Sequence, residues 1–485
     1  MKRRVGGLET EFGLVCVRAD GSRALEPEAA ARELFRPVVA MGRSSNVFLG
    51  NAARLYLDVG SHPEYATAEC DDWWELVAQD RAGERIFAEL TAQANERLAA
   101  DGQDARIHLL KNNVDSAGNA FGSHENFLVD RRGEFTRLPR YLLPFLVTRQ
   151  IITGAGGVVR PQQPVGAGPA AAAPAAAADA APEPAQFVFS RRSDHMWEAV
   201  SSATTRTRPI INTRDEPHGD PTRFRRLHVI VGDSTMSEVS THLRFATTDL
   251  VLRAIESGRA LPELSLHDDI SAIRAVARDL SGSAPIPLSH GGTTTAIEVQ
   301  QRWLDHVTPL ADESEQQVLE TWQKGIDAVR TGDRSWAATH LDWAIKERLF
   351  QQVTERRGIE LGDPAIERLD LAYHDIDPAH GIFHTLQRRG LAPATLPEER
   401  IEAARTTAPT TTRAHLRGQV VTTATQHGVD HVVDWTTMRL TRPGSMPVQV
   451  LDPFTTALPA VDDLLAQIRD LGTESGPGPA PAPFA

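Results

Sequence analysis

Cysteine and long apolar runs are both scarce in this sequence, and each scarcity excludes a class of protein. The 485 residues include two cysteines, Cys16 and Cys70. This count excludes a disulfide framework and favours a reducing compartment, so we expect a cytoplasmic location. No window approaches the roughly 18 apolar residues that cross a bilayer. The basic start "MKRR" is followed by Glu9 and Glu11 instead of the apolar core of a signal peptide, so we expect no membrane partner.

A net positive charge and the common phosphate-binding loop are also lacking. The net charge is −13, which argues against nucleic acid as a partner of the whole surface. The pattern G-x-x-x-x-G-K-[ST] does not occur, so any bound ATP is not held by a P-loop. No set of cysteines and histidines has zinc spacing, and His62 in "SHPEY" is more simply a loop hydrogen-bonding group than a ligand.

The length and the composition predict one large domain and one small domain. The segment 164–185 consists almost entirely of alanine, proline and glycine, which offer too little apolar surface to repay ordering. We expect a disordered insertion there, inside a large domain of residues 1–407. A small domain of residues 408–470 begins with the threonine-rich stretch "PTTT", and residues 471–485 are expected to form a disordered tail.

The periodicity of the sequence predicts a mixture of strands and helices. Apolar residues recur at helical spacing in 27–41, in 72–100 and in several segments between 294 and 353. Alternation predicts strands in "GLETEFGLV", "HENFLVD" and "RRLHVIVGD". In the first of these, Glu9, Glu11 and Gly13 share one face, and in the last Arg226 and His228 share one face.

The stretch "ARLYLDVGSHPEYATAEC", residues 53–70, has an unusual polar face. Leu55, Leu57 and Val59 alternate with Arg54, Tyr56 and Asp58, and Glu64 and Glu69 follow. A polar strand face is normally just the side that meets water. Acids gathered on neighbouring strands would repel one another, however, unless cations lay between them. Magnesium accepts carboxylate oxygens and bridges to phosphates, so these faces suggest nucleotide-driven phosphoryl transfer.

Six ordered blocks of this sequence closely resemble the Pup ligases of the PafA type, enzymes that attach the prokaryotic ubiquitin-like protein Pup to lysines. The resemblance extends from Arg3 to about Ile468, and its blocks are "GLETEFG", "GRSSNVFLGNAARLYLDVGSHPEYATAEC", "KNNVDSAGNAFGSHENFLV", "VSSATTRTRPIINTRDEPH", "RRLHVIVGDSTMSE" and "LDLAYHDI". It implies an α+β fold: a large glutamine synthetase-like domain with a curved, mainly antiparallel sheet backed by helices, plus a small C-terminal domain. The alanine- and proline-rich insertion and the tail lie outside these blocks.

The resemblance also implies roles for particular residues. It marks Glu9, Tyr56 and Glu64 as magnesium ligands. Strand geometry places Glu11 beside Glu9, so Glu11 is an additional candidate for a magnesium ligand and is equally well explained as a structural acid. The resemblance marks Arg54, Thr67 and Trp435 as ATP contacts, although a tryptophan there could equally be buried at a domain interface. It marks Asp58 as the proton acceptor, the alternative being an acid of the metal shell.

The implied reaction is an ATP-dependent ligation. The γ-carboxylate of the C-terminal glutamate of Pup would become an acyl phosphate and then an isopeptide with a lysine ε-amine of a target protein, marking that target for the proteasome. The family favours a monomer, and the link to the proteasome is indirect. One alternative is the Pup deamidase and depupylase of the same superfamily, which typically has a longer loop between its first two strands. Another is an inactive Pup-binding adaptor, against which the intact acid set argues.

Several charged residues keep open assignments. Glu69 has no assigned role. The arginines around "PIINTRDEP" are candidates for phosphate or carboxylate contacts, with solvated surface groups as the alternative: Arg206, Arg208 and Arg214. A second basic group, Arg223, Arg225 and Arg226, is a candidate for attracting the acidic Pup chain.

Overall fold

A sheet of eight strands forms the centre of the protein in this computed structural model. The structure describes residues 1–42, 44–58, 60–115, 118–131, 137–160, 184–203 and 208–475. The sheet order is β10-β11-β12-β7-β1-β5-β4-β3, and every neighbouring pair except β10 and β11 is antiparallel. In that order the strands are Glu198–Ser201, Pro209–Asn212, Phe224–Val229, Ser123–Asp130, Gly6–Glu11, Pro63–Ala66, Arg54–Leu57 and Asn46–Phe48. The predicted α+β class with a mainly antiparallel sheet is confirmed.

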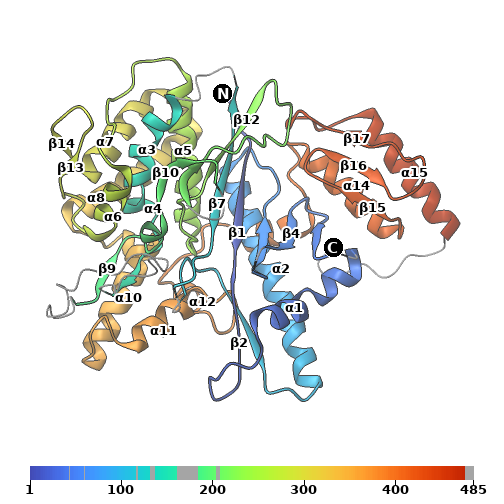
Figure 1. Ribbon diagram of the computed structural model, residues 1–485, viewed down its shortest axis with the longest axis horizontal. Coiled ribbons are helices and arrows are strands. Elements are labelled where there is room, and N and C mark those ends of the chain that lie inside the picture. The colour runs from blue at the N-terminus through green and yellow to red at the C-terminus, as the bar shows by residue number, and fades with distance from the viewer. Residues whose placement is uncertain are drawn as a thin grey trace, which may run out of the picture.

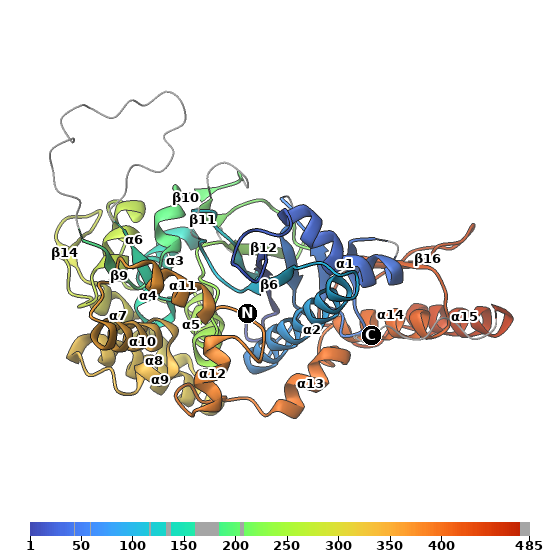
Figure 2. The ribbon, with the colours of Figure 1, turned by 90° about the horizontal axis from the view of Figure 1, so that it is seen from below.

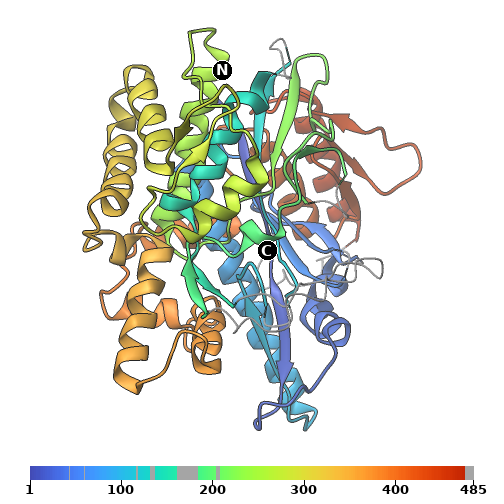
Figure 3. The same cartoon turned by 60° about the vertical axis from the view of Figure 1, so that its left-hand side comes forward.

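Helices cover one face of this sheet. In Figure 1 strands β1 and β7 run through the middle, and helices α3 to α8 lie to the left of them. The helices of the large part are α1 (Pro27–Gly42), α2 (Trp73–Ala100), α3 (Arg137–Thr148), α4 (Gln150–Thr153), α5 (Glu238–Glu256), α6 (Asp269–Arg278), α7 (Ala296–Val307), α8 (Gln316–Thr331), α9 (Ala337–His340), α10 (Asp342–Arg357), α11 (Pro364–Tyr373), α12 (Ile382–Arg388) and α13 (Glu398–Thr406). Figure 3 shows the yellow and orange helices of residues 296–357 stacked at one side.

The core between sheet and helices follows from the alternation of the strands. Phe127 of β7 and Leu227 of β12 point to the helical side and pack in one large apolar cluster with α3, α5, α7 and α8. Leu55 of β4 and Tyr65 of β5 pack against α2 in a second cluster. Gly83 allows α2 to pack closely against β5, because a side chain at this position would place its Cβ atom within 2.4 Å of the Tyr65 ring. Burial on this face leaves the other face of the same strands for polar side chains.

The strand predicted over "GLETEFGLV" is two strands. β1 ends at Glu11, and β2 (Gly13–Val17) pairs instead with β6 (Arg106–Leu110) in a separate two-stranded antiparallel sheet. Phe12 lies at the break, and its buried ring contacts Phe87 of α2 at 4.8 Å between ring centroids. The predicted helices 27–41 and 72–100 agree with α1 and α2, and Asp72 begins α2 by accepting a hydrogen bond from the amide of Glu75. Two further hairpins are β8 (Gly157–Val159) with β9 (Gln186–Val188) and β13 (Ile286–Pro287) with β14 (Thr293–Thr294).

A small C-terminal part has its own sheet and its own core. Strands β15 (His431–Val433), β16 (Thr437–Leu440) and β17 (Val448–Gln449) pack on helices α14 (Ala414–Gln426) and α15 (Pro459–Ser475). This part stands at the right of Figures 1 and 2, on the side away from α6 to α8. The predicted small C-terminal domain is confirmed as a sheet-containing unit, and its boundaries at 408 and 470 stay a prediction.

Helix α15 continues past the predicted end of the small domain. The tail was expected from residue 471, yet the helix ends at Ser475. Leu471 packs against the small apolar core, and Gly472 lies so close to His427 that a Cβ atom would come within 2.3 Å of its ring. Residues 471–475 therefore belong to helix α15, whereas the domain boundary at 470 stays a prediction. The rest of the predicted tail, like nearly all of the predicted insertion at 164–185, lies outside the described residues.

Candidate functional site

Polar side chains from five adjacent strands gather on the face of the sheet that the helices leave open. The strands β12, β7, β1, β5 and β4 each place their second set of alternating residues there. These residues are Glu9, Glu11, Arg54, Tyr56, Glu64, His124, Asn126, Arg226 and His228. The face thus unites segments more than 170 positions apart in the chain.

Three carboxylates form one tight cluster on this face. Glu11 and Glu64 are direct cross-strand partners, and Asp58 lies in the turn after β4. Oxygen atoms of all three lie within 4.8 Å of one another. Tyr56 is the cross-strand partner of Glu64 on the other side, and its hydroxyl donates a hydrogen bond to Glu64. The sequence-predicted residues Tyr56, Asp58 and Glu64 are therefore neighbours, and Glu11 belongs with them.

The electrostatics of this cluster are unbalanced. Among the residues that the structure describes, no lysine or arginine forms an ion pair with Glu11 or Glu64. Burial and the charges of Glu9 and Glu11 raise the pKa of Glu64 well above its usual range. Burial and the neighbouring carboxylates likewise raise the pKa of Tyr56. Burial alone would raise the pKa of Glu11 as well, but His62 and the amide of Gly122 help to lower it to about 2.

Glu9 is the centre of a second cluster on the same face. Its carboxylate lies 3.3 Å from Nδ1 of His124 and 3.7 Å from Nε2 of His228, and these three residues form a second possible set of ligand atoms within 4.8 Å. Asn126 donates a hydrogen bond to Glu9 over 3.1 Å. Although burial opposes it, the contacts with His124 and His228 hold the pKa of Glu9 well below its usual range.

The donor set of these clusters fits a hard divalent cation. Carboxylate oxygens are ligands that magnesium prefers, the Tyr56 hydroxyl adds a further oxygen, and a cation would relieve the repulsion that raises the pKa of Glu64. The Glu9 cluster adds two imidazoles, which also suit softer divalent metals. Glu9 acts electrostatically on both Glu64 and Tyr56, so the two clusters face a common space.

An open pocket of about 90 Å³ begins beside Glu9. It lies between the sheet and the small C-terminal part, and its wall includes Thr67, Glu69, Asn126, Arg226 and Trp435. Thr67 is buried, and its hydroxyl accepts a hydrogen bond from the Leu8 amide over 3.0 Å. Trp435 comes from the small part, so the pocket needs both parts of the chain.

Arg54 is not in the wall of this pocket, although its strand partner Ala66 is. Its guanidinium lies 4.7 Å from the centre of the Tyr56 ring, and Nε donates a hydrogen bond to Asn46 over 2.7 Å. The predicted nucleotide contacts thus fall in two places: Thr67 and Trp435 in the pocket, and Arg54 beside the acid cluster.

Sequence reasoning missed His124 and Asn126 as site residues. Both lie in "SHENFLV", where alternation predicts a strand, and the polar face of that strand was the available signal. Their importance follows from the pairing of β7 with β1, which sets His124 directly opposite Glu9. His228 and Arg226 were recognised as sharing a face but not as belonging to this site.

The basic groups that the sequence left open are mostly paired with acids. Arg223 forms an ion pair with Asp452, Arg225 with Asp215, and Arg226 with both Glu216 and Glu9. Arg214 contacts Glu216. Arg206 lies outside the described residues, and Arg208 directly precedes β11. Arg226 therefore belongs to the Glu9 cluster.

Known proteins match the chain over nearly its whole length. It is 84% identical to a Pup–protein ligase of Brachybacterium faecium, with both chains fully covered. It is 49% identical to Pup–protein ligase 1 of Rhodococcus erythropolis, over 96% of this chain and all of the other. Within the described residues, no helix combines the length and apolar character needed to cross a membrane.

Two solved structures share the fold. One is a crystal structure of the complex between Pup and its ligase PafA, with a TM-score of 0.89, 41% identity, and coverage of 97% of this chain and 93% of that one. The other is the Pup ligase PafA in complex with ADP, with a TM-score of 0.82, 43% identity, and coverage of 92% and 94%. The family model described as Pup-ligase protein matches residues 4–439. The chain therefore belongs to the Pup-ligase family.

Proposed function

We propose that this protein is an ATP-dependent ligase that joins Pup to lysines of target proteins. The bond formed is an isopeptide between the γ-carboxylate of the C-terminal glutamate of Pup and a lysine ε-amine. The observation that carries the proposal is the acid cluster of Glu11, Asp58 and Glu64 on the same sheet face as Glu9, next to an open pocket walled by Thr67 and Trp435. The identity to Pup–protein ligases supports the choice of substrate.

The pocket beside Glu9 is the proposed ATP site. Trp435 offers an aromatic face for the adenine base, and Thr67 lies opposite it on the sheet side. The phosphates would then extend along the open face toward Arg54, whose guanidinium can pair with phosphoryl oxygens. The ADP complex of a related ligase agrees with this use of the fold.

The clustered acids are the proposed magnesium site. Glu9, Tyr56 and Glu64 are the proposed ligands, and Glu11 is a further one because it is the strand partner of Glu64. His124 and His228 complete a second candidate set with Glu9. Bound magnesium would neutralise the triphosphate and the charge that develops on the transferred phosphoryl group. Without a cation, these carboxylates would repel an approaching polyphosphate.

Asp58 is the proposed proton acceptor. A carboxylate does not react with an amine directly, so the γ-carboxylate of Pup first takes the γ-phosphoryl group of ATP and ADP is released. The target ammonium has a pKa of about 10.4 and must lose one proton before it attacks. The nitrogen loses a second proton as the carbon–nitrogen bond forms and phosphate departs. Asp58 is exposed at the edge of the cluster, where a lysine can reach it, and accepts that proton.

The remaining expectations stay predictions. A cytoplasmic location rests on the low cysteine content, and both cysteines are free and buried. The monomeric state and the indirect link to the proteasome rest on the family resemblance. The deamidase reading and the inactive adaptor stay as alternatives that an activity assay separates.

The test combines the protein with Mg-ATP, Pup ending in glutamate and a lysine-bearing target, followed by intact-protein mass spectrometry. We expect the target to gain the mass of one Pup minus one water, with ADP formed. A parallel sample contains Pup ending in glutamine. Loss of its amide without a conjugate would establish the deamidase, whereas a protein that forms no conjugate and removes no amide would be the adaptor.

A further inference from the structure

Glu69 is a buried acid of the pocket wall that the magnesium site does not use. It follows β5 on the large part of the chain, and its side chain is 12% exposed. Its partners are two arginines from the start of the small part. Nε of Arg413 donates a hydrogen bond to Oε1 over 2.9 Å, and Nη2 of Arg417 donates one to Oε2. One carboxylate therefore holds two buried guanidinium groups across the boundary between the two parts.

Arg417 continues this connection to the aromatic wall of the pocket. Its guanidinium lies 5.0 Å from the centre of the Trp435 ring and 5.1 Å from that of Phe48. Nη1 also donates a hydrogen bond to the Trp435 carbonyl over 2.9 Å. The two rings meet edge to face at 5.0 Å. The Trp435 ring therefore rests on a guanidinium whose direction Glu69 sets.

Arg413 connects Glu69 to the opposite rim of the same pocket. Nη1 donates a hydrogen bond to the Val450 carbonyl over 2.8 Å, and Nη2 donates one to the His218 carbonyl. His218 and Arg413 both line the pocket, and the His218 ring lies 6.1 Å from Trp435. Through two arginines, Glu69 thus contacts both sides of the opening.

We propose that Glu69 is a positioning residue that holds Trp435 in the orientation required for nucleotide binding. This inference rests on the proposed ATP site in this pocket. Without its charge, Arg413 and Arg417 are two buried cations with no carboxylate between them, and they repel each other. Arg417 then loses the direction that places it under Trp435. Glu69 has no contact with the acid cluster. Loss of the Glu69 charge therefore weakens the binding of nucleotide but does not change the affinity for Pup.

The test is calorimetric binding of Mg-ADP together with separate KM values for ATP and for Pup. We expect Glu69→Gln to raise the Kd for ADP and the KM for ATP about tenfold, while the KM for Pup changes less than twofold. Arg417→Lys is the second variant. Arg417→Lys keeps a cation that can pair with Glu69 but loses the planar guanidinium that contacts both rings. We therefore expect the KM for ATP to rise and the KM for Pup to stay nearly unchanged, as in Glu69→Gln.

Asp452→Asn is the matched control. Arg223 and Asp452 also form an ion pair between the large and small parts, over 2.8 Å, but both side chains are at least one-third exposed and neither contacts Trp435. We expect its Kd for ADP to equal that of the unchanged protein. If this control weakened ADP binding as much as Glu69→Gln, general loosening between the two parts would explain the effect and the inference would be overturned.

Trp435→Ala separates this inference from the proposed function. If Trp435→Ala weakens ADP binding while Glu69→Gln and Arg417→Lys do not, the ATP site stands and the role of Glu69 is refuted. If Trp435→Ala binds ADP as tightly as the unchanged protein, the pocket is not the nucleotide site. If all three variants weaken ADP binding with the KM for Pup preserved, both hold.

Discussion

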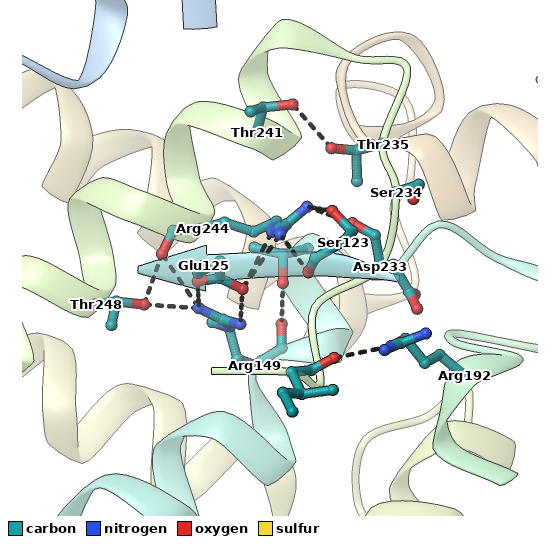
Figure 4. Close-up of polar contacts among 12 residues, drawn as sticks. Ser123, Glu125, Arg149, Arg192, Asp233, Ser234, Thr235, Thr241, Arg244 and Thr248 are labelled. Atoms are coloured by element: carbon teal, nitrogen blue, oxygen red, sulfur yellow. Dashed lines mark hydrogen bonds and ion pairs between the residues drawn. The ribbon is translucent and has the colours of Figure 1, made fainter. Parts of the chain in front are cut away.

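Glu125 and Glu64 are buried carboxylates on opposite faces of the same sheet, and their surroundings differ completely. Glu125 of β7 faces the helices, where Arg149 binds both of its oxygens over 2.7 and 2.8 Å and Arg244 approaches within 3.3 Å. Figure 4 shows these groups converging on Glu125. Glu64 of β5 faces the other way, toward Glu11 and Asp58.

The difference separates a structural acid from a functional one. The charge of Glu125 is neutralised within the chain, so the group is complete once the protein is folded. The charges of Glu64 and Glu11 repel each other, and the folded chain supplies no lysine or arginine partner among its described residues. Such a cluster is completed only by something from outside, and the proposed divalent cation would fill that role. Glu69 resembles Glu125, because it too has two arginines.

The largest effect is expected on the open face at Asp58. Replacing Asp58 with alanine removes the proposed proton acceptor, so the rate of conjugate formation should fall about a thousandfold. Mg-ADP binding should persist, because Asp58 does not line the pocket. The measurement is single-turnover conjugation followed by mass spectrometry, with Glu399→Gln, an exposed acid of α13, as control. Normal conjugation by Asp58→Ala would refute its assignment.

Glu125→Gln should have its main effect on stability. It leaves Arg149 and Arg244 buried without their carboxylate, which costs about 3–5 kcal/mol in the free energy of unfolding. Urea unfolding followed by circular dichroism measures this loss. Conjugation per folded molecule should change only a few-fold. A variant that unfolds like the unchanged protein yet fails to conjugate would break the distinction between the two faces.

The ion pairs of Glu69 with Arg413 and Arg417 should make the stability of the protein sensitive to acid. Burial would raise the pKa of Glu69, but Arg417 and Arg413 lower it to about 2 from an ordinary value of 4.5. A lowered carboxyl pKa adds stability that is complete above pH 4.5 and is lost as the pH falls toward 2. The full contribution is about 3 kcal/mol. Stability of Glu69→Gln should therefore fall less steeply between pH 5 and pH 3, and equal slopes in chemical unfolding would contradict the pairing.

Magnesium should stabilise the protein through the unpaired acids. At a concentration one hundred times its dissociation constant, a bound ion adds about 2.7 kcal/mol, which raises the melting temperature. Glu64→Gln removes one carboxylate and should abolish most of this increase, whereas Glu399→Gln should retain it. Differential scanning calorimetry with and without magnesium gives the comparison. An unchanged increase in Glu64→Gln would mean that the ion binds elsewhere.

The smallest effect is expected where a paired acid is exposed. Arg140 and Glu263 approach within 2.8 Å, but their side chains are 57% and 41% exposed. Solvent screening leaves such exposed pairs with little effect on stability. Glu263→Gln should leave the free energy of unfolding nearly unchanged in urea titrations. A loss as large as that of Glu125→Gln would show that burial is not what distinguishes these pairs.

Much of the open face could be predicted because strand alternation is a local property. A period of two puts Glu9 with Glu11, and Arg54 with Tyr56, whatever their partners are. Helix α2 was likewise predictable from its apolar spacing and its Asp72 cap. The break at Phe12 was not, because alternation continues through it while the hydrogen-bonding partner changes from β5 to β6.

The contacts that make the site work depend on the order of strands in the sheet. Nothing local to "SHENFLV" shows that His124 will lie opposite Glu9, and nothing local to Glu69 shows that Arg413 and Arg417 will enclose it. These pairs are separated by more than 100 residues, and only the folded chain brings them together.

By itself the sequence determined much of the secondary structure, the polar faces and the family, because all three depend on residues that are near one another in the chain or on ordered blocks of them. Only the tertiary structure decided which acids are paired and which are left unpaired. Strand pairing and the approach of the small part set those distances, and the interaction of two charges depends on their separation and burial. Glu125, Glu69 and Glu64 are the same residue type, and their different roles follow from the partners that the fold provides.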